Sequence, residues 1–244
     1  MCIGLLAVSM ALARSASVIR AIGTAGVLVA GLFGVQTVLF IVSITNTEVA
    51  NTLVAVSAAP LFAATYERVL FGRPIGRRLL AVIMVAILGI GIMVSGSLGR
   101  GNLWGDLAGL GAAAGLGGSF VVIGRYRDRF MVPAIGLGGL VAAAIALPWA
   151  SPLAATASDY GYLAISGLVV LPLGFGLLAV APRFIPGPEV ALITLLETVL
   201  GPFWVWLALG EVPVPAAVVG GLVVIGALAL NSAAMLRTGS VGRS

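Results

Sequence analysis

The sequence has very little charge. Only 9% of its 244 residues are charged and 61% are hydrophobic, whereas about a quarter of the residues in an ordinary soluble domain are charged. So little charge excludes water as the main solvent around the folded chain. The hydrophobic residues gather in long stretches, so the sequence predicts an all-α, polytopic integral membrane protein.

Two residue types that often carry enzyme chemistry are absent or nearly so. The chain has no histidine, which excludes histidine proton relays and histidine metal sites. Its single cysteine, Cys2, cannot form a disulfide framework, a zinc cluster or a redox pair within one chain. A Walker loop, a dinucleotide fingerprint and a Gly-x-Ser-x-Gly elbow are also missing from the sequence. We therefore predict no cofactor, no metal site and no catalytic residue.

The apolar stretches have the length of transmembrane helices. Crossing the hydrocarbon of a bilayer takes about 20 apolar residues, because each helical residue adds about 1.5 Å. Eight stretches reach this length. A ninth, residues 1–13, is too short to cross and ends before Arg14. No basic residue precedes it, so we interpret it as the end of a helix rather than as a signal peptide. The eight full spans are residues 22–43, 49–70, 79–98, 103–123, 132–149, 161–181, 188–209 and 214–235.

The basic residues, all of them arginine, are distributed unevenly over the loops. Twelve of the 13 fall in alternate loops and in the tail, and Arg100 alone falls on the other side. Basic residues favour cytoplasmic loops, so we predict that the arginine-rich face and the C-terminus are cytoplasmic. Trp104, Trp149 and Trp206 fall near the opposite ends of their helices, where tryptophan favours the membrane interface. The net charge of +5 thus reflects topology, and we predict no nucleic-acid partner.

Two loops occupy equivalent places in the two halves of the chain. Residues 70–74 and 208–212 each follow a helix that we expect a proline to interrupt, Pro60 in one half and Pro202 in the other. Arginines surround the first loop and an acidic residue lies in the second, so the loops belong on opposite faces. This pattern predicts an inverted repeat of five-helix units with the first unit incomplete. The predicted units are residues 1–99 and 100–236, followed by a cytoplasmic tail at 237–244.

Two stretches resemble a known family. Residues 49–94, which contain AAPLF at 58–62, resemble the fourth and fifth helices of EamA-type proteins in the drug/metabolite transporter superfamily. The run LLETVLGP at 195–202, continued to LGE at 209–211, resembles that family's ninth helix and the loop after it. The chain is therefore identified as a member of this family.

The resemblance implies a fold and an activity. Members of the family are typically ten-helix carriers with both termini in the cytoplasm, and they export amino acids, related metabolites or drugs. Against that pattern, this sequence lacks the first helix and part of the second. Arg73 stands where the first repeat usually has glutamate, and Thr198 stands where the second often has proline.

Glu197 is the main candidate for a functional residue. It lies about 13 Å into the span 188–209, close to the bilayer midplane. A charged group at that depth costs about 3 kcal/mol and normally faces the bundle interior. Helical spacing places Thr194 and Trp204 on the same face. We predict that Glu197 contacts a substrate amine or takes up a proton, with Thr194 and Trp204 beside it. The alternative is a structural carboxyl that holds helices together.

Other polar residues inside the spans are weaker candidates. Gln36 lies mid-helix between two phenylalanines, where it could face a cavity or form an interhelical hydrogen bond. Asn51 and Glu189 lie near helix starts, where helix capping explains them. Asp106 is expected to complement the dipole of its helix. Glycines in pairs such as Gly105/Gly109 and Gly111/Gly115 predict close helix packing.

The sequence thus predicts a secondary transporter that exports small metabolites, such as amino acids, across the bacterial inner membrane by alternating access. Its expected partners are a small-molecule substrate and the lipid bilayer. Two alternatives stay open. One is a non-transporting or decayed membrane subunit, and the other is a membrane enzyme.

Overall fold

A computed structural model of the chain describes residues 17–47, 49–93, 95, 102–149, 156–209 and 215–241. Within these residues the structure is helical and contains no strand, which confirms the predicted all-α class. The expected helix end at residues 1–13 lies outside the described part of the chain. In chain order the helices are α2 (Ser17–Asn46), α3 (Val49–Val56), α4 (Ala59–Phe71), α5 (Arg77–Met93), α6 (Leu103–Arg125), α7 (Val132–Ala146), α8 (Ala157–Ile165), α9 (Leu171–Val180), α10 (Gly187–Leu209) and α11 (Pro215–Val241).

Short segments of other helix types adjoin these helices. The 3-10 turns η2 (Leu147–Trp149) and η5 (Ala181–Arg183) follow α7 and α9. The π-helical turn η4 (Ser166–Val170) joins α8 to α9, so that these two helices form one long element. A π-turn widens the helix locally and leaves its backbone bonds less regular.

The eight predicted spans coincide with these helices. Wherever a span lies in the described residues, it falls on one helix or on consecutive helical elements. In the part of the chain that the structure describes, five helical segments are long and apolar enough to cross a membrane by themselves, and they confirm a multi-pass membrane protein. They are Gly23–Asn46, Asn51–Phe71, Leu103–Arg125, Val132–Trp149 and Tyr160–Arg183.

The two prolines that were expected to interrupt helices behave differently. Pro60 lies in the first turn of α4, just after the break that separates α3 from α4. Pro60 has no backbone N–H to donate to a carbonyl one turn earlier, so the hydrogen bonds of α3 do not continue into α4, and a proline is tolerated in the first turn of the new helix. The expected interruption at Pro202 is wrong, because α10 is continuous from residue 187 to 209. A membrane bundle tolerates the one backbone bond that such a proline removes.

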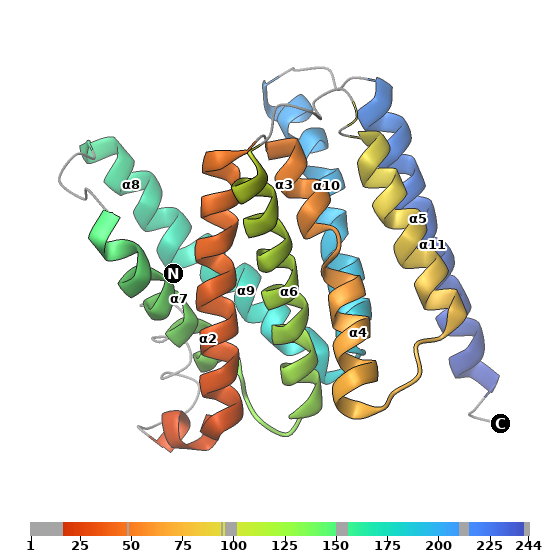
Figure 1. Cartoon of the computed structure of the whole chain (residues 1–244), viewed down its shortest axis with the longest axis horizontal. Helices are drawn as coiled ribbons and strands as arrows, with labels where there is room; N and C mark the ends of the chain where they lie inside the picture. Colours follow the sequence, from red (N-terminus) through yellow and green to blue (C-terminus); the bar gives the residue numbers. More distant parts are fainter. Residues whose placement is uncertain are drawn as a thin grey trace.

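The helices run alternately up and down when α3 with α4, and α8 with α9, are each taken as one element, and α6 lies near the middle of the bundle (Figure 1). Helix α2 packs along α6 and α7, α4 packs against α6 and α10, and α5 pairs with α11. In the most apolar stretch of α6, 67% of the residues are buried, against 11% in the Tyr160–Arg183 segment. Helix α6 is therefore a core helix, and the α8–α9 element lies at the edge of the described bundle.

Buried side chains form distinct clusters on the two sides of the bundle. One cluster joins α2, α6 and α7 through residues such as Phe33, Ile123 and Ile135. Another joins α4, α5, α10 and α11, where Ile83 and Leu192 are almost fully buried. The second cluster packs the N-terminal half of α10 against α4, α5 and α11.

Glycines let the helices approach closely. A Cβ added to Gly115 of α6 would lie 2.6 Å from the Cβ of Gln36 on α2, and one added to Gly117 would lie 2.6 Å from the carbonyl oxygen of Ala59 on α4. The expected packing role of the two glycine pairs is confirmed. Added Cβ atoms at Gly105, Gly109 and Gly111 would also come within 3 Å of neighbouring residues.

Helices that the predicted repeat makes equivalent lie beside each other. Helix α5 contacts α11, and α4 contacts α10. Each pair runs in opposite directions (Figure 1), which is what an inverted relation between the halves requires. The boundaries of the two repeats stay a prediction.

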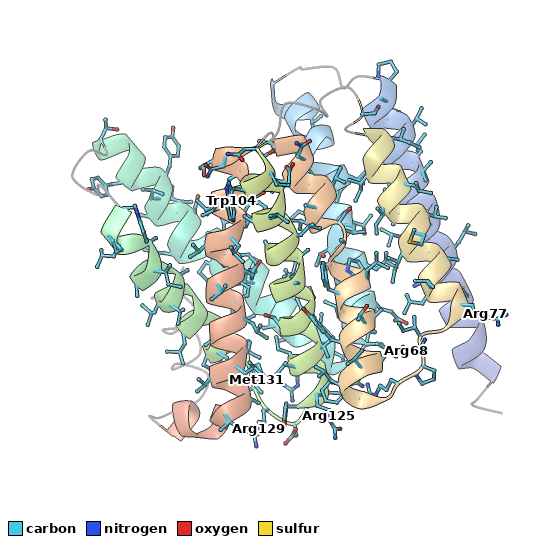
Figure 2. The ribbon with its side chains drawn as sticks, viewed as in Figure 1. Arg68, Arg77, Trp104, Arg125, Arg129 and Met131 are labelled. Atoms are coloured by element: carbon cyan, nitrogen blue, oxygen red, sulfur yellow. The ribbon has the colours of Figure 1, made fainter. Side chains whose placement is uncertain are left out.

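The arginines and tryptophan that define the predicted faces are visible in the structure. Arg68, Arg125 and Arg129 lie at one end of the bundle and Trp104 lies toward the other (Figure 2). The separation of arginine from tryptophan that the sequence predicts is therefore present among these residues. The end of the bundle that carries Arg68, Arg125 and Arg129 is called the arginine end below.

Candidate functional site

A stripe of exposed side chains runs along α10. Its members are separated by four and then three residues, so they follow one face of the helix. The opposite face is buried, with Ala191, Leu192 and Leu195 packed in the core. The stripe, called the α10 stripe below, consists of Ile193, Glu197, Leu200, Trp204 and Leu207.

Glu197 is the one ionisable side chain of the α10 stripe. It lies next to the middle of the 23 residues of α10, and its side chain is exposed on the surface of the bundle. Among the described residues, the structure shows no ion pair or hydrogen bond for its carboxyl group. Hydrocarbon is an unfavourable solvent for a carboxylate, by about 3 kcal/mol at a helix centre. The α10 stripe is therefore better suited to line a wet cavity or a helix contact than to face lipid.

The other two candidates on α10 lie on or beside the stripe. Thr194 is partly buried, and its hydroxyl donates to the carbonyl oxygen of Ala191 at 2.7 Å. Trp204 is 58% exposed and lies two turns beyond Glu197. The structure thus groups Glu197, Trp204 and Thr194 on one side of α10, as helical spacing predicted. Their role in substrate binding or proton coupling stays a prediction.

Gln36 lies elsewhere. It is 7% exposed and is buried on α2, where α6 approaches closely at Gly115. Its amide donates to the hydroxyl of Thr37 at 3.2 Å, on the same helix and not across to α6. The principal neighbours of α2 are α6 and α7, so the structure separates Gln36 from the α10 stripe. Its predicted part in the site stays untested.

A polar pocket of about 320 Å³ lies at the arginine end of the bundle. It forms where α4, α5, α10 and α11 meet the loop after α4. Carboxyl, guanidinium and amide groups line it together with apolar side chains. The polar residues of this inner-end pocket are Glu67, Arg73, Arg78, Glu189 and Asn231.

Hydrogen bonds fix part of the lining of the inner-end pocket. Arg78 donates from Nη2 to the carbonyl oxygens of Asn231 and Leu230, at 2.6 and 3.2 Å, and so ties α5 to α11. The Nη1 atom of Arg73 lies 3.9 Å from Oε1 of Glu67, with the two side chains 49% and 14% exposed. Oε2 of Glu189 is buried and has no hydrogen-bond partner among the described residues.

Sequence reasoning did not find this pocket. It assigned Glu189 to helix capping, used Arg73 and Arg78 to orient the chain, and noted Arg73 as a departure from the family pattern. The one signal in the sequence was the presence of acidic residues among the arginines of the same face. That signal does not show that Glu67 and Glu189, which are far apart in sequence, line one cavity.

Comparison with known protein families identifies the family of this chain. The sequence profile of the EamA-like transporter family matches residues 103–233, which is more than half of the chain. The chain belongs to the EamA-like transporter family. Members of this family are transporters and not enzymes, so the EamA-like chain is a membrane protein of the drug/metabolite transporter type.

A solved structure supports the fold of the EamA-like chain. It is described only as the crystal structure of a protein, and it matches with a TM-score of 0.80 at 16% sequence identity. The match covers 97% of this chain and 86% of that chain. The TM-score establishes the shared fold, and at so low a sequence identity the match shows the fold alone. No curated protein sequence matches the chain significantly.

A second set of polar contacts lies at the opposite end of the EamA-like bundle. The hydroxyl of Thr47 donates to Oδ1 of Asp106 at 2.8 Å and accepts from Asn51 at 3.1 Å. Ser43 and Thr52 share a buried hydrogen bond of 2.7 Å. These bonds join α2, α3 and α6. Asp106 lies in the first turn of α6 as expected, and it also holds the turn between α2 and α3.

No metal site is formed by the described residues. In that part of the chain, no group of three or more cysteine, aspartate or glutamate side chains is close enough to hold an ion. The α10 stripe, with its exposed carboxyl group, and the inner-end pocket are the two candidate sites among the described residues.

Proposed function

We propose that this EamA-like chain is a secondary transporter that exports small metabolites, such as amino acids or related compounds, by alternating access. The observation that carries the proposal is Glu197, a carboxyl group next to the middle of α10 on its exposed stripe. Ionisable groups at such depth in a membrane commonly bind substrate or relay protons. Trp204 and Thr194 give the same surface an aromatic face and a hydroxyl.

Alternating access requires the two halves to move relative to each other. The direct contacts of α4 with α10 and of α5 with α11 support such a movement, because each pair joins the predicted repeats. Among the described residues, three helix irregularities give places where helices can bend. They are the non-helical backbone at Gly23 of α2, the break between α3 and α4, and the π-turn Ser166–Val170.

The orientation is part of the proposal. The arginine end faces the cytoplasm because basic residues are retained on that side of a bacterial inner membrane. Helix α11 runs toward the arginine end (Figure 1), so the C-terminus is also cytoplasmic. Export then means movement from the arginine end to the end that carries Trp104.

One other function has a specific observation in its favour. The α10 stripe could be the contact surface of a membrane subunit that transports nothing, because four of its five members are apolar. A carboxyl group in the middle of the stripe favours transport, since a purely structural contact would be more stable without it. A membrane enzyme has no such support, because the family consists of transporters.

Transport into inside-out membrane vesicles tests the proposal. Vesicles from cells that produce the full chain are offered a panel of labelled amino acids and related metabolites. We expect at least one compound to accumulate faster than in vesicles without the protein, and Glu197→Gln to lower its initial rate at least tenfold. Asp128→Asn is the matched control, because Asp128 is exposed in the turn after α6, and its rate should equal that of the wild type.

Two results would contradict different parts of the proposal. If no compound of the panel moves faster than in control vesicles, the transport function is wrong. If a compound moves and Glu197→Gln transports it at the wild-type rate, transport stands and the assignment of Glu197 is wrong.

A further inference from the structure

The inner-end pocket is separate from the α10 stripe. Glu189 and Glu197 lie on the same helix, eight residues and therefore about 12 Å apart along its axis. Glu189 faces the meeting point of α4, α5 and α11, whereas Glu197 is exposed on the outer face of α10. The proposed function above makes no use of the pocket.

The charged groups of the pocket differ in whether they have hydrogen-bond or ion-pair partners. The guanidinium of Arg78 donates to two backbone carbonyls of α11. Arg73 lies beside Glu67. In contrast, Oε2 of Glu189 is buried and accepts no hydrogen bond from the described residues. A buried carboxyl oxygen without a donor is unfavourable, so this position favours a ligand that donates hydrogen bonds.

The size and shape of the pocket limit the kind of donor. A volume of about 320 Å³ is at the lower end of the range of small-molecule sites. Ala64, Ile75 and Leu79 add an apolar wall to the polar groups. A bare metal ion does not fit this lining, because the described residues place no three acidic ligands together. A primary ammonium group with a short apolar tail fits both the carboxyl groups and the apolar wall.

We propose that the inner-end pocket binds the protonated amine of a substrate, with the ammonium group donating to Glu189 and the apolar tail against Ile75 and Leu79. Glu67 supplies a second carboxyl on the same lining. This inference rests on the proposed transport function, which it deepens by naming amine-bearing compounds as the substrate class. The pocket is then the place where the substrate first binds at the arginine end before it reaches Glu197.

Three probes that share the same branched tail separate the possible ligand chemistries. Isopentylamine is a cation at neutral pH, L-leucine is a zwitterion, and 4-methylpentanoate is an anion with a similar branched tail. Binding of each to the purified full chain in lipid nanodiscs is measured by calorimetry. We expect isopentylamine to bind, L-leucine to bind equally or more weakly, and 4-methylpentanoate to give no measurable binding.

Variants locate the bound amine. Glu189→Gln should weaken isopentylamine binding at least tenfold, because the amide carries no charge and offers one acceptor oxygen. Glu67→Gln is the second variant and should also weaken binding, by a smaller factor. Asp128→Asn is the control and should bind like the wild type. Circular dichroism and gel filtration establish that each variant is folded, and the second variant keeps the test valid if the first does not fold.

Several results would overturn the inference. They are binding of 4-methylpentanoate as tight as that of isopentylamine, wild-type affinity in folded Glu189→Gln, and no binding of isopentylamine at 10 mM, which would mean that water alone fills the pocket. Failure of the inference is distinct from failure of the proposed function. Vesicles that transport a metabolite while Glu189→Gln binds amine normally would refute the inference alone, and Glu189-dependent binding without any transport would refute only the function.

Discussion

Glu197 lies next to the middle of α10, and at the bilayer depth that the sequence predicts for it a carboxyl group lowers the stability of a membrane protein. The cost at a helix centre is about 3 kcal/mol, and the described residues supply no ion pair that would offset it. Residues of this kind are retained for function at the expense of stability in many proteins. The same reasoning gives a test that distinguishes a functional carboxyl from a structural one.

Replacing Glu197 with leucine should separate stability from transport. Glu197→Leu makes the α10 stripe entirely apolar. We therefore expect it to raise the unfolding free energy of the protein in detergent by about 1–3 kcal/mol, which is measured as a higher thermal unfolding midpoint. Transport should be abolished. Leu200→Ile on the same stripe is the control and should change neither. A lower unfolding midpoint in Glu197→Leu would show that the carboxyl group holds helices together, as the structural alternative states.

The sequence was informative about side chains whose surroundings follow from one helix. The grouping of Glu197 with Thr194 and Trp204 depends only on helical periodicity, which the sequence contains directly. The surroundings of Gln36 depend on how closely α6 approaches α2 at Gly115, which one segment alone does not determine. The surroundings of Glu189 are harder still to predict from the sequence, because four helices and a loop line its pocket.

Close contact between α4 and α6 depends on the absence of a side chain at Gly117. An alanine Cβ there would lie 2.6 Å from the carbonyl oxygen of Ala59 and 2.9 Å from the amide nitrogen of Ala63. Backbone atoms of α4 cannot move aside without displacing the helix. We therefore expect Gly117→Ala to lower the unfolding free energy by about 1–3 kcal/mol, the usual range for overpacking.

Gly31→Ala is the matched control for that variant. Gly31 also lies inside a helix, and an added Cβ would meet no atom within 4 Å. This substitution should leave the thermal unfolding midpoint unchanged or raise it slightly, because alanine favours helix more than glycine does. Equal unfolding midpoints for the two variants would contradict the close packing of α6 on α4.

Helix breaks were predicted in two places and found in one. A proline has opposite effects in the first turn of a helix and in its interior, and the sequence does not state which of these a given proline occupies. At Pro60 a new helix begins, so the chain breaks before it. At residue 202 the surrounding apolar run is long enough on both sides to remain one helix.

For the whole molecule, the sequence predicted the positions of the spans and their arginine-rich face better than it predicted how the helices pack against one another. Span positions and the arginine face follow from local hydrophobicity and charge, and both are present in the described residues. The central place of α6 and the pairing of α5 with α11 depend on contacts between distant segments. The inner-end pocket is a product of that arrangement, which is why only the structure reveals it.

The central claim is that the EamA-like chain is a carrier with a site that opens to each side in turn, and counterflow tests it most directly. Purified protein is reconstituted into liposomes loaded with an unlabelled compound that the vesicle panel has identified, and the liposomes are diluted into a trace of labelled compound. A carrier exchanges internal for external molecules, so we predict that label rises transiently above its equilibrium level, and that Glu197→Gln abolishes this rise. Label that only equilibrates, or fails to enter, would contradict the claim.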